Sequence, residues 1–507
     1  MGRAVAASLG WHFIDVDATV EAEAGATVAE IFARDGAAVF RVRERMALQR
    51  ALQNKRVVIA VGGGALLEPS TRHEALRCAL VITLGASMST LLERLSAGPE
   101  RPLLRGGQQA LEVLLDERRV AYAEAHASVD ANGPIEVVAS AVLAMVRRPM
   151  PMVMPLGERT YPVHVGPLNG LAREVATRTT SVLVTDATVE QHWGAVAKRA
   201  LGGRPALVVL RPGERSKTLH SVARVWKAAG TEGADRSVTI ACLGGGVVTD
   251  VGGFAAATWL RGVPYLSIPT SLLAMVDASV GGKTGIDLPE GKNLVGAFHQ
   301  PSLVWIDPEV LATLAPRHFR AALAEVVKIA AVRDEPLLDW LEAHATMLGS
   351  RITPSAFAPR GVVESMIRRA VQAKIDVVAE DERESGVRAL LNFGHTIGHA
   401  LEAGAAYRAL HGDCVAVGMR AELSLGEALG VTSRELRQRV VRLIDALGLA
   451  RSVKADGTIA EAALRFDKKR EKGVFRVALA AGAGVGVVAE VSSRELMLAL
   501  RTVNEIR

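Results

Sequence analysis

The sequence predicts an α/β protein whose C-terminal part is mainly helical. Two stretches, residues 1–147 and 156–316, alternate short apolar runs with segments of helical spacing, and such alternation is typical of parallel α/β domains. From residue 317 onward, apolar residues recur every three or four positions, which indicates helices. The chain of 507 residues is long enough for roughly two to four domains with sizeable cores.

In the first stretch, residues 2–9 predict a helix, and the expected elements that follow are a strand at 11–16, mostly helix at 28–40, and strands at 57–61 and 80–84. The last two are continuous apolar runs, as buried parallel strands are. Residues 148–155, RPMPMVMP, hold three prolines and no helix or strand pattern, so they predict a linker.

After the linker, a second α/β domain begins at residues 161–165, and its further strands are expected at 181–185, 206–210 and 238–243. In the C-terminal part, helical spacing is clearest at 320–332 and 361–378. The predicted plan is therefore an α/β domain at 1–147, a linker at 148–155, an α/β domain at 156–316 and a helical domain at 317–507.

Composition narrows the class of protein. The net charge is +6, with 49% hydrophobic and 22% charged residues, and the basic residues are scattered, which favours anionic small molecules over nucleic acid as ligands. Cys78, Cys242 and Cys414 lie far apart, which indicates a reducing compartment without disulfides. We expect a cytoplasmic protein, because no apolar run reaches the ~18 residues of a membrane span and no signal peptide is recognisable.

A glycine turn follows the strand at 238–243. Gly244, Gly245 and Gly246 lead into a small-residue segment that can be helical, and such a turn can bring backbone N–H groups against a phosphate. The spacing fails the dinucleotide pattern GxGxxG, because Thr249 stands at its last position. A tight connection without a ligand therefore remains open. Polar residues in this apolar stretch favour an anionic ligand over a solvated loop face: Asp250, Arg261, Asp277, Lys283, Lys292 and Asn293.

Histidines gather in the helical part. His395 and His399 are four residues apart and project from one face of a helix, and His411 follows, in a chain with 12 histidines. Such grouping indicates a metal site. Glu325, on an apolar helix, is a candidate carboxylate ligand, because an unpaired buried carboxylate is costly. The spacing leaves His395, His399 and Glu402 as a rival set.

Three motifs identify a family. LGGGVVTDVGGFAAATWLRG, PTSLLAMVDASVGGKTGI and GKNLVGAFHQP resemble the 3-dehydroquinate synthase family, as do PGERSK, NFGHTIGHALEA and HGDCVAVG. The resemblance covers about residues 155–490. It implies a Rossmann-like NAD domain, a helical metal domain and a homodimer through this half. It also implies conversion of 3-deoxy-D-arabino-heptulosonate 7-phosphate to 3-dehydroquinate and phosphate, with recycled NAD and Zn²⁺ or Co²⁺.

The resemblance also implies roles for residues. It assigns the metal to Glu325, His395 and His411, which leaves His399 for proton transfer. It implies a catalytic and substrate-binding set of Arg261, Lys283, Lys292, Asn293, Lys328, Lys374, Arg388, Asn392, His399 and Lys468, the last in the motif DKK. It implies a cofactor site of Glu214, which would bind ribose hydroxyls, Lys217, which would extend over the site, and Gly245, Gly246, Val247, Asp250, Thr270, Ser271, Asp277, Lys283 and Lys292.

The first domain resembles another family. FIDVDATVE, IFARDGAAVFRVRE, AVGGGALL, ERPLL and ERRVAYAEAH are similar to shikimate kinase, which phosphorylates shikimate with ATP and Mg²⁺. The resemblance implies Asp15 near the metal ion, Arg101 on a mobile lid, and a shikimate site of Asp17, Arg41, Gly62, Gly63, Gly64 and Arg118. Guanidinium groups suit a carboxylate because they bind it with two parallel hydrogen bonds.

This domain departs from the kinase pattern at its start. Such kinases begin with a strand and a GxxxxGK[ST] phosphate loop, whereas this sequence begins at Met1, Gly2 and Arg3, beyond that loop. We therefore expect no cradle for nucleotide phosphates, a gap in the sheet and an unpaired strand edge. We favour a start codon placed too late, with kinase activity only if the loop lies upstream. The alternative is a non-catalytic binding module.

Two further enzymatic interpretations of residues 156–507 remain open. One is a sugar-phosphate cyclase that makes another carbocycle, and the other is a metal-dependent polyol dehydrogenase. A different cyclase is expected to vary the groups around Lys283 and Arg388, and a dehydrogenase to lack most of the lysines. Because 3-dehydroquinate synthase and shikimate kinase serve one biosynthetic route, the two resemblances reinforce each other.

Overall fold

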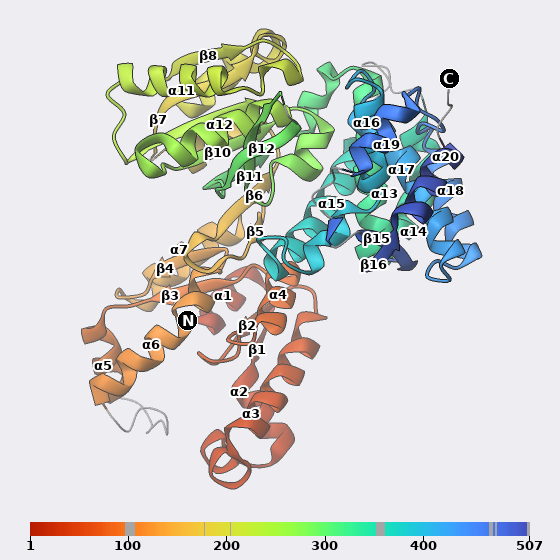
Figure 1. Ribbon diagram of the computed structural model, residues 1–507. Coiled ribbons are helices and arrows are strands. Elements are labelled where there is room, and N and C mark those ends of the chain that lie inside the picture. The colour runs from red at the N-terminus through yellow and green to blue at the C-terminus, as the bar shows by residue number, and fades with distance from the viewer. Residues whose placement is uncertain are drawn as a thin grey trace. The chain divides into compact units, whose positions relative to one another are not determined.

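The computed structural model describes residues 1–96, 107–176, 178–202, 204–289, 291–350, 360–465, 470–471 and 474–503. The chain divides into two compact units, Met1–Pro162 and Val163–Arg507 (Figure 1). The finer domain boundaries that the sequence suggests stay predictions. Within the described ranges, no helix combines the length and the apolar character that crossing a membrane requires.

The first unit alternates helices and strands, as predicted. Its elements are α1 Gly2–Leu9, β1 His12–Asp15, α2 Val16–Ala24, α3 Val28–Leu52, β2 Val57–Ala60, α4 Pro69–Cys78, β3 Ile82–Gly85, α5 Met88–Ser96, α6 Gly107–Ala123, β4 Ala127–Asp130, α7 Ile135–Val146 and β5 Met152–Met154. The predicted linker therefore contains a short strand that its three prolines did not suggest. Gly36, with φ 82° and ψ 167°, interrupts α3.

Strands β1 to β4 of the first unit form two separate parallel pairs, β1 with β2 and β3 with β4. Among the described residues no ladder joins β2 to β3, so the predicted gap in the sheet is confirmed. Local capping fixes the segment after β1. Asp15 accepts a hydrogen bond from the N–H of Ala18 and so caps α2, and Gly25 ends α2 in a left-handed conformation at φ 61°. These caps hold Asp17 in the first turn of α2.

The second unit begins with an α/β part, as predicted. Its elements are β6 Tyr161–Val165, η3 Leu168–Gly170, α8 Leu171–Val175, β7 Thr179–Asp186, α9 Ala187–Val189, η4 Glu190–Gly194, α10 Ala195–Leu201, β8 Ala206–Leu210, η5 Glu214–Ser216, α11 Leu219–Thr231, β9 Val238–Gly244, α12 Gly246–Thr258, η6 Trp259–Arg261, β10 Tyr265–Pro269, η7 Ala274–Ala278, β11 Lys283–Leu288, β12 Gly291–Phe298, β13 Leu303–Ile306 and η8 Pro308–Thr313.

Six of these strands pair in the order β6-β13-β10-β9-β7-β8, and every described pairing among them is parallel. β9 is central and buried along its whole length. Residues of α11 and α12 pack against one face of the sheet and residues of α8 and α10 against the other. Such a doubly covered parallel sheet binds ligands at the carboxyl ends of its strands. β11 and β12 form an antiparallel hairpin outside this sheet.

The remainder of the second unit is mainly helical, as predicted. Its elements are α13 Pro316–Arg333, α14 Glu335–Gly349, α15 Arg360–Glu380, η9 Val387–Asn392, α16 His395–Gly404, α17 His411–Ala428, α18 Arg434–Ala446, α19 Gly457–Arg465, β14 Arg470–Glu471, β15 Val474–Gly482, β16 Val485–Ser492 and α20 Ser493–Val503. The antiparallel hairpin of β15 and β16 was not predicted. Its apolar residues pack with α16, α17, α19 and α20 in one core.

Close packing of α12 on β9 gives a test of the fold. A Cβ atom on Gly252 would lie 2.3 Å from the sulfur of Cys242, whereas a Cβ on Gly230 in α11 would meet Trp259 at an ordinary 3.5 Å. Gly252→Ala should therefore lower the free energy of unfolding by about 1–3 kcal/mol through overpacking. Gly230→Ala should raise it by about 0.5–1 kcal/mol, because a helical glycine is replaced without a clash. Urea denaturation followed by circular dichroism measures both, and equal effects of the two variants would contradict the packing described.

Candidate functional site

The glycine turn lies where β9 meets α12. Gly245 occupies the N-cap of α12 without a side-chain cap, so the first N–H groups of the helix are not covered by a capping side chain. A Cβ on Gly245 would lie 3.4 Å from Ser271 Oγ, and a Cβ on Gly246 would lie 3.5 Å from Ala278 Cβ. Thr270 donates its N–H to Gly244 O at 3.0 Å. The turn, including Val247, therefore presents backbone N–H groups at the carboxyl end of the sheet, an arrangement suited to a phosphate.

Lys217 anchors the β11–β12 hairpin beside this turn. Its side chain is buried, and its ammonium forms an ion pair with Asp250 and donates to the amide oxygen of Asn293. Asn293 in turn donates its N–H to Asp287 Oδ1 at 2.8 Å, with its own backbone left-handed at φ 55°. Lys217 therefore contacts two other predicted site residues, because a buried ammonium requires a counter-charge and finds one in Asp250. Its place over a bound cofactor stays a prediction. Burial also raises the pKa of Asp250 to about 6.

Glu325, His395 and His411 converge, as predicted. Glu325 Oε1 lies 3.5 Å from His395 Nε2 and 3.4 Å from His411 Nε2. Donors bound to one tetrahedral ion at about 2.0–2.1 Å are separated by about 3.3–3.4 Å, so these distances suit a shared cation. Both Glu325 oxygens are buried and have no hydrogen bond of standard geometry from the described residues. This buried acceptor with imidazoles around it fits a divalent metal.

Two groups orient the imidazoles toward Glu325. His395 Nδ1 lies 3.2 Å from the carbonyl oxygen of Phe393, and His411 Nδ1 lies 3.3 Å from Glu402 Oε2. Such contacts fix the ring of a metal-binding histidine and leave Nε2 for the ion. Burial lowers the pKa of His411, but Glu325 and Glu402 outweigh it and raise that pKa to about 10. Glu402 therefore acts as an orienting group in this structure, which disfavours the rival ligand set.

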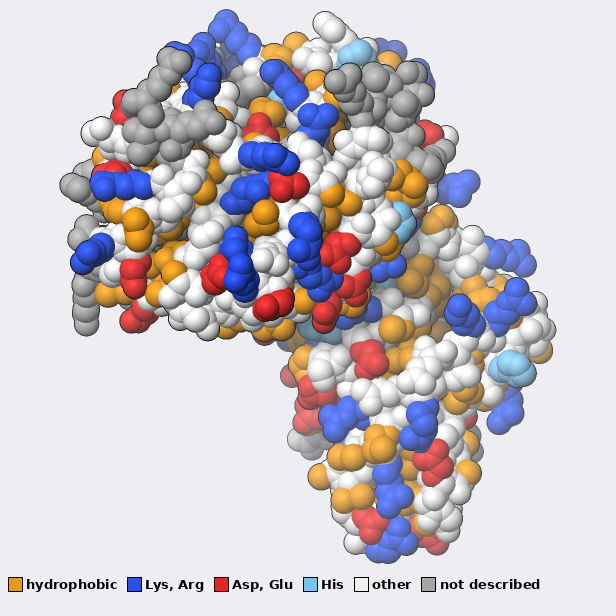
Figure 2. Space-filling view, turned by 90° about the vertical axis from the view of Figure 1, so that its right-hand side faces the viewer, with side chains coloured by type: hydrophobic (Ala, Val, Ile, Leu, Met, Phe, Trp, Pro, Cys, Tyr) orange, Lys and Arg blue, Asp and Glu red, His pale blue; other side chains and the backbone are white. Residues whose placement is uncertain are grey.

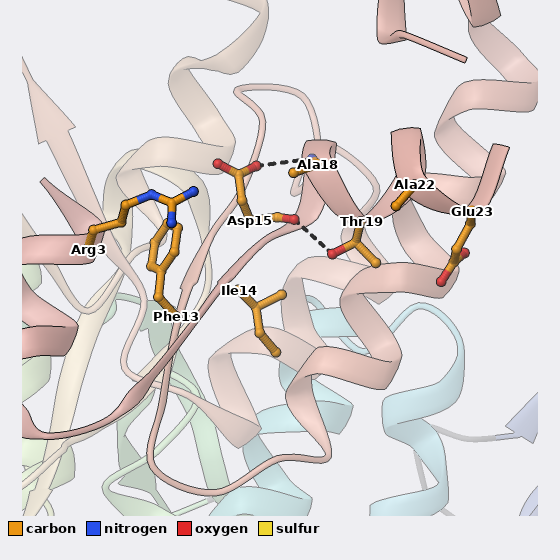
Figure 3. A pocket seen from close by; sticks show the side chains of 8 residues that line it. All are labelled: Arg3, Phe13, Ile14, Asp15, Ala18, Thr19, Ala22 and Glu23. Atoms are coloured by element: carbon orange, nitrogen blue, oxygen red, sulfur yellow. Dashed lines mark hydrogen bonds between the residues drawn. The ribbon is translucent and has the colours of Figure 1, made fainter. Parts of the chain in front are cut away.

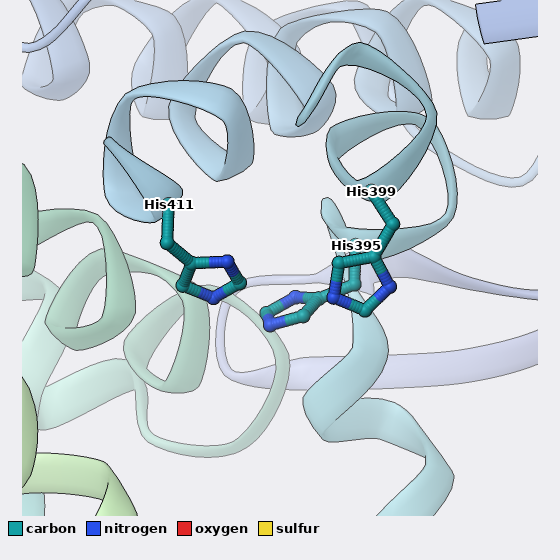
Figure 4. A group of neighbouring side chains, drawn as sticks. All are labelled: His395, His399 and His411. Atoms are coloured by element: carbon teal, nitrogen blue, oxygen red, sulfur yellow. The ribbon is translucent and has the colours of Figure 1, made fainter. Parts of the chain in front are cut away.

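His399 completes the group of three histidines shown in Figure 4. Its ring centroid lies 5.2 Å from that of His395 and 5.8 Å from that of His411, and its side chain is exposed. One nitrogen from each of the three rings falls within a span of 4.8 Å. His399 can thus reach the ion site or a ligand beside it, which suits a group that exchanges protons with solvent.

Glu422 holds the helix that carries these histidines, and no sequence pattern pointed to it. Its fully buried carboxylate accepts the N–H of Gly394 at 2.5 Å and the N–H of Ile397 at 3.1 Å. These N–H groups belong to the first turn of α16, where a negative charge is also favoured by the helix dipole. His395 is the first residue of α16, so Glu422 sets its position.

Two buried lysines carry carboxylate partners. Lys328 lies one helical turn from Glu325 and pairs with Glu325 Oε2. Lys374 pairs with the carboxylate of Asp277 and donates to its carbonyl oxygen at 2.6 Å. Burial lowers the pKa of Lys374 to about 8, against the opposing effect of Asp277. Burial raises the pKa of Asp277, but Lys374 and Lys328 outweigh it and lower that pKa to about 2. Both lysines are therefore buried as members of ion pairs.

A carboxylate that the sequence analysis did not single out connects two predicted substrate-binding residues. Glu384 pairs with Lys283 through Oε2 and accepts the amide N–H of Asn392 at 2.8 Å through Oε1. Its backbone is left-handed at φ 60°, a conformation that costs a residue with a side chain about 1 kcal/mol or more. Such strain next to polar groups is typical of a functional site. The structure therefore adds Glu384 to the predicted cluster.

Two predicted arginines differ in burial. Arg388 is 2% exposed, and it donates to the carbonyl oxygens of Glu382 and, at 3.0 Å, Gly281. It therefore holds the loop before β11, because a buried guanidinium satisfies its donors locally. Arg261 is exposed at the end of η6 with φ 68°, and no hydrogen bond or ion pair among the described residues links it to the cluster. Arg101 and Lys468 lie outside the described residues.

Basic and acidic side chains are mixed on one face of the molecule. On the face drawn in Figure 2, Lys and Arg side chains are interspersed with Asp and Glu.

The first unit contains a second polar cluster at its own glycine turn. A Cβ on Gly62 would lie 2.8 Å from Glu44 Oε1 and 3.2 Å from Asp17 Oδ1, and a Cβ on Gly63 would lie 2.2 Å from Arg118 Nη1. A Cβ on Gly64 would meet Arg41 at 2.3 Å. The predicted residues Asp17, Arg41, Gly62, Gly63, Gly64 and Arg118 are therefore brought together.

This cluster contains buried polar atoms without a hydrogen-bond partner among the described residues. Arg118 Nε and Glu44 Oε1 are buried and have no hydrogen-bond partner among the described residues. Arg41 pairs with the other oxygen of Glu44, whose pKa is raised by burial. Buried donors and acceptors are normally satisfied, so a ligand with carboxylate and hydroxyl groups would complete the cluster. Glu44 was not singled out from the sequence.

An open pocket lies beside β1 in the first unit, and Figure 3 shows it. Its volume is about 520 Å³, and Arg3, Phe13 and Asp15 are among its lining residues. The guanidinium carbon of Arg3 lies 4.9 Å from the centroid of the Phe13 ring. Asp15 therefore borders open space, and its place near a metal ion stays a prediction.

Comparison with family models assigns both units. The model described as 3-dehydroquinate synthase N-terminal matches residues 207–321, and the model described as 3-dehydroquinate synthase C-terminal matches residues 322–470. The shikimate kinase model matches residues 1–147.

Similar proteins agree with the models. The 3-dehydroquinate synthase of Nostoc punctiforme is 42% identical over 347 residues, which cover 66% of this chain and 94% of that protein. The 3-dehydroquinate synthase of Symbiobacterium thermophilum is 44% identical over 334 residues, 64% of this chain and 91% of that protein. One solved structure is 2-epi-5-epi-valiolone synthase of Streptomyces hygroscopicus subsp. jinggangensis with NAD⁺ and Zn²⁺ bound. It is 33% identical, with a TM-score of 0.62, over 68% of this chain and 96% of that chain.

A more distant structure, 2-deoxy-scyllo-inosose synthase complexed with carbaglucose-6-phosphate, NAD⁺ and Co²⁺, shares the fold at 24% identity, with a TM-score of 0.61 over 68% of this chain and 98% of that chain. The second unit thus has the fold of the sugar-phosphate cyclases. Within that class, the chain belongs to the 3-dehydroquinate synthase family, and its first 147 residues match shikimate kinase.

The role of Glu422 gives a testable expectation. Glu422→Ala should lower the free energy of unfolding by about 2–4 kcal/mol, because two buried N–H groups lose their acceptor. Glu422→Gln should cost less, because one acceptor oxygen remains. Hydrogen exchange at the amide of Ile397 should accelerate in the alanine variant. Unchanged exchange there would show that another group holds the first turn of α16.

Proposed function

We propose that the second unit is a 3-dehydroquinate synthase, which converts 3-deoxy-D-arabino-heptulosonate 7-phosphate to 3-dehydroquinate and phosphate. The observation that carries the proposal is the approach of Glu325 to both His395 and His411 within 3.5 Å. The glycine turn and the lysine-rich cluster lie in the same unit, and the family match supports the assignment. NAD and a divalent metal, Zn²⁺ or Co²⁺, are the proposed cofactors.

Glu325, His395 and His411 would hold the metal. Two imidazoles and one carboxylate leave coordination positions open, which is typical of a catalytic rather than a structural zinc site. A metal bound there would polarise substrate oxygens. Lys328 keeps the Glu325 carboxylate charged and oriented, since Lys328 is itself buried against it.

The dinucleotide would lie across the carboxyl end of the sheet, with its phosphates at the N–H groups of Gly245 and Gly246. Lys292 Nζ and Glu214 Oε1 lie 3.5 Å apart and would contact the ribose hydroxyls. NAD supplies acceptance and return of one hydride. Asp250 and Lys217 would contribute by fixing the hairpin that carries Lys292.

Lys283, Asn392 and Lys374 would bind and orient an anionic substrate. Lys283 and Asn392, which Glu384 holds in place, would bind substrate oxygens, and Lys374 would bind a carboxylate or hydroxyl near Asp277. His399 would move protons between substrate and solvent, because its exposed imidazole lies beside the other two rings. In this arrangement Arg388 positions the loop that carries Gly281 rather than binding substrate itself.

Another cyclase is the second candidate, because 2-epi-5-epi-valiolone synthase is 33% identical to this chain. The chain carries Lys283 and Arg388, around which a different cyclase is expected to vary the groups. It also retains the lysines that a polyol dehydrogenase would lack. The residues therefore favour the dehydroquinate-forming reaction.

The proposed reaction can be tested with the full chain, the heptulosonate phosphate and NAD far below the substrate concentration. We expect 3-dehydroquinate and phosphate in equal amounts, without accumulation of NADH, as measured by NMR and absorbance. Treatment with a chelator should abolish turnover, and added Zn²⁺ or Co²⁺ should restore it. Glu325→Gln should weaken zinc binding at least tenfold, because the only carboxylate of the proposed ligand set is lost.

The exposed His220 offers a control. His220→Ala should leave zinc stoichiometry and turnover unchanged. Stoichiometric NADH would identify a dehydrogenase instead, and a different carbocycle would identify another cyclase. Full turnover by metal-free protein would exclude the proposed metal site.

We also propose that the first unit binds shikimate at Asp17, Arg41 and Arg118. Titration calorimetry with the full chain should detect binding. Arg118→Met should weaken it at least tenfold, because a charged hydrogen bond contributes about 1.5–3 kcal/mol. The matched control is Arg119→Met, since Arg119 is exposed and pairs with Glu158 instead. Equal affinity of both variants would refute a carboxylate site at Arg118.

We further propose that the protein is a cytoplasmic homodimer that associates through the second unit. Three cysteines without disulfides, Cys78, Cys242 and Cys414, support a reducing compartment. The family resemblance supports the dimer.

A further inference from the structure

Glu402 connects the histidine cluster to the β11–β12 hairpin. Its side chain is buried at 4% exposure, and it uses its two oxygens separately. Oε2 lies 3.3 Å from His411 Nδ1, and Oε1 accepts from Lys292 Nζ at 2.7 Å. His411 begins α17 and Lys292 lies in β12, so one carboxylate joins two elements that are far apart in the sequence.

Lys292 extends this connection toward the proposed dinucleotide site. Its ammonium lies 3.5 Å from Glu214 Oε1 and 4.8 Å from the centroid of the Tyr407 ring. A cation over an aromatic ring is stabilised electrostatically. Lys292 is therefore held from three sides, by Glu402, Glu214 and Tyr407, and its direction depends on all three.

The turn between α16 and α17 is strained where it supports this arrangement. Ala406 and Tyr407 have left-handed φ angles of 50° and 57°, which cost about 1–2 kcal/mol each for residues with a side chain. The N–H of Tyr407 donates to the carbonyl oxygen of Glu402 at 2.9 Å. The strained turn thus fixes the backbone of Glu402 and the aromatic ring over Lys292 together.

One cationic partner would be enough to balance the charge of a buried carboxylate. Glu402 has two partners, one a proposed metal ligand, His411, and the other a proposed cofactor residue, Lys292. Fixing either partner restricts the carboxylate and, through it, the other partner.

We propose that Glu402 is a positioning residue that couples metal binding at His411 to NAD binding at Lys292 and Glu214, an inference that rests on the proposed function. A metal on His411 fixes the ring and the shared carboxylate, so the dinucleotide meets a Lys292 that is already ordered. The entropy cost of ordering Glu402 and its two partners is then paid by the first ligand alone. The second ligand binds more tightly as a result, which is positive coupling between the two sites. By linkage, NAD tightens metal binding by the same factor as the metal tightens NAD binding.

The experiment measures both affinities in the metal-free full chain. Zinc affinity is determined by competition with a chromophoric chelator, with and without saturating NAD. NAD affinity is determined by titration calorimetry, with and without Zn²⁺. In the unsubstituted protein we expect each ligand to lower the Kd of the other by about fivefold or more.

The variants separate the two halves of the connection. Glu402→Gln should weaken zinc binding by about 10–100-fold, as loss of a group that orients a metal ligand does, and should reduce the mutual effect to less than twofold. Lys292→Gln should leave zinc affinity in the absence of NAD within about twofold and also remove the mutual effect. Glu427→Gln is the matched control, because Glu427 on α17 pairs with Arg437, and it should retain full coupling.

Several outcomes would overturn the inference. The inference is wrong if the coupling persists in Glu402→Gln, or if this variant binds zinc as tightly as the unsubstituted protein. Binding of both ligands without any coupling, together with normal turnover, would refute the inference and leave the proposed function intact. Coupling without formation of 3-dehydroquinate would support the inference and refute the proposed function. If the protein binds neither ligand, the inference and the proposed function are both refuted. If Glu402→Gln fails to fold, as shown by its thermal transition, Lys292→Gln decides.

Discussion

The buried carboxylate of Glu325 is the constraint on which the site depends. An ionised carboxylate inside a protein is costly unless cations or donors surround it, and α13 is buried along most of its length. Lys328 from the same helix and two imidazoles from α16 and α17 supply those partners. The positions of the three helices are therefore linked through Glu325.

Neighbouring carboxylates extend the same principle outward. Glu422 holds the start of α16, Glu402 orients His411, and Glu384 joins Lys283 to Asn392. Each of these acids contacts a polar group that would otherwise lack a partner or be free to move. The side chains proposed to react are thus held in place by Glu422, Glu402 and Glu384, which have no role in the proposed chemistry itself.

The sequence predicted the part of this arrangement that depends on periodicity and on family motifs. The parallel strands, the helix after Gly246 and the helical C-terminal part follow from local apolar patterns, and the motifs brought Glu325, His395 and His411 together correctly. It did not predict Glu384, Glu422 or the orienting role of Glu402, because an acid that supports a helix start or a distant lysine leaves no local pattern. Nor did it predict that Arg388 and Lys217 would be used internally, since burial of a cation depends on three-dimensional packing. The hairpin β15–β16 was missed because helices dominate its surroundings.

The pairing of the lysines has a consequence for how substrate arrives. Ion pairs join Lys217 to Asp250, Lys283 to Glu384, Lys292 to Glu402, Lys328 to Glu325 and Lys374 to Asp277. At distances beyond a Debye length of about 8–10 Å, such pairs act as dipoles whose fields largely cancel. These five ion pairs therefore exert little long-range attraction on a phosphorylated sugar. Recognition happens at contact, and the rate of encounter should vary only weakly with ionic strength.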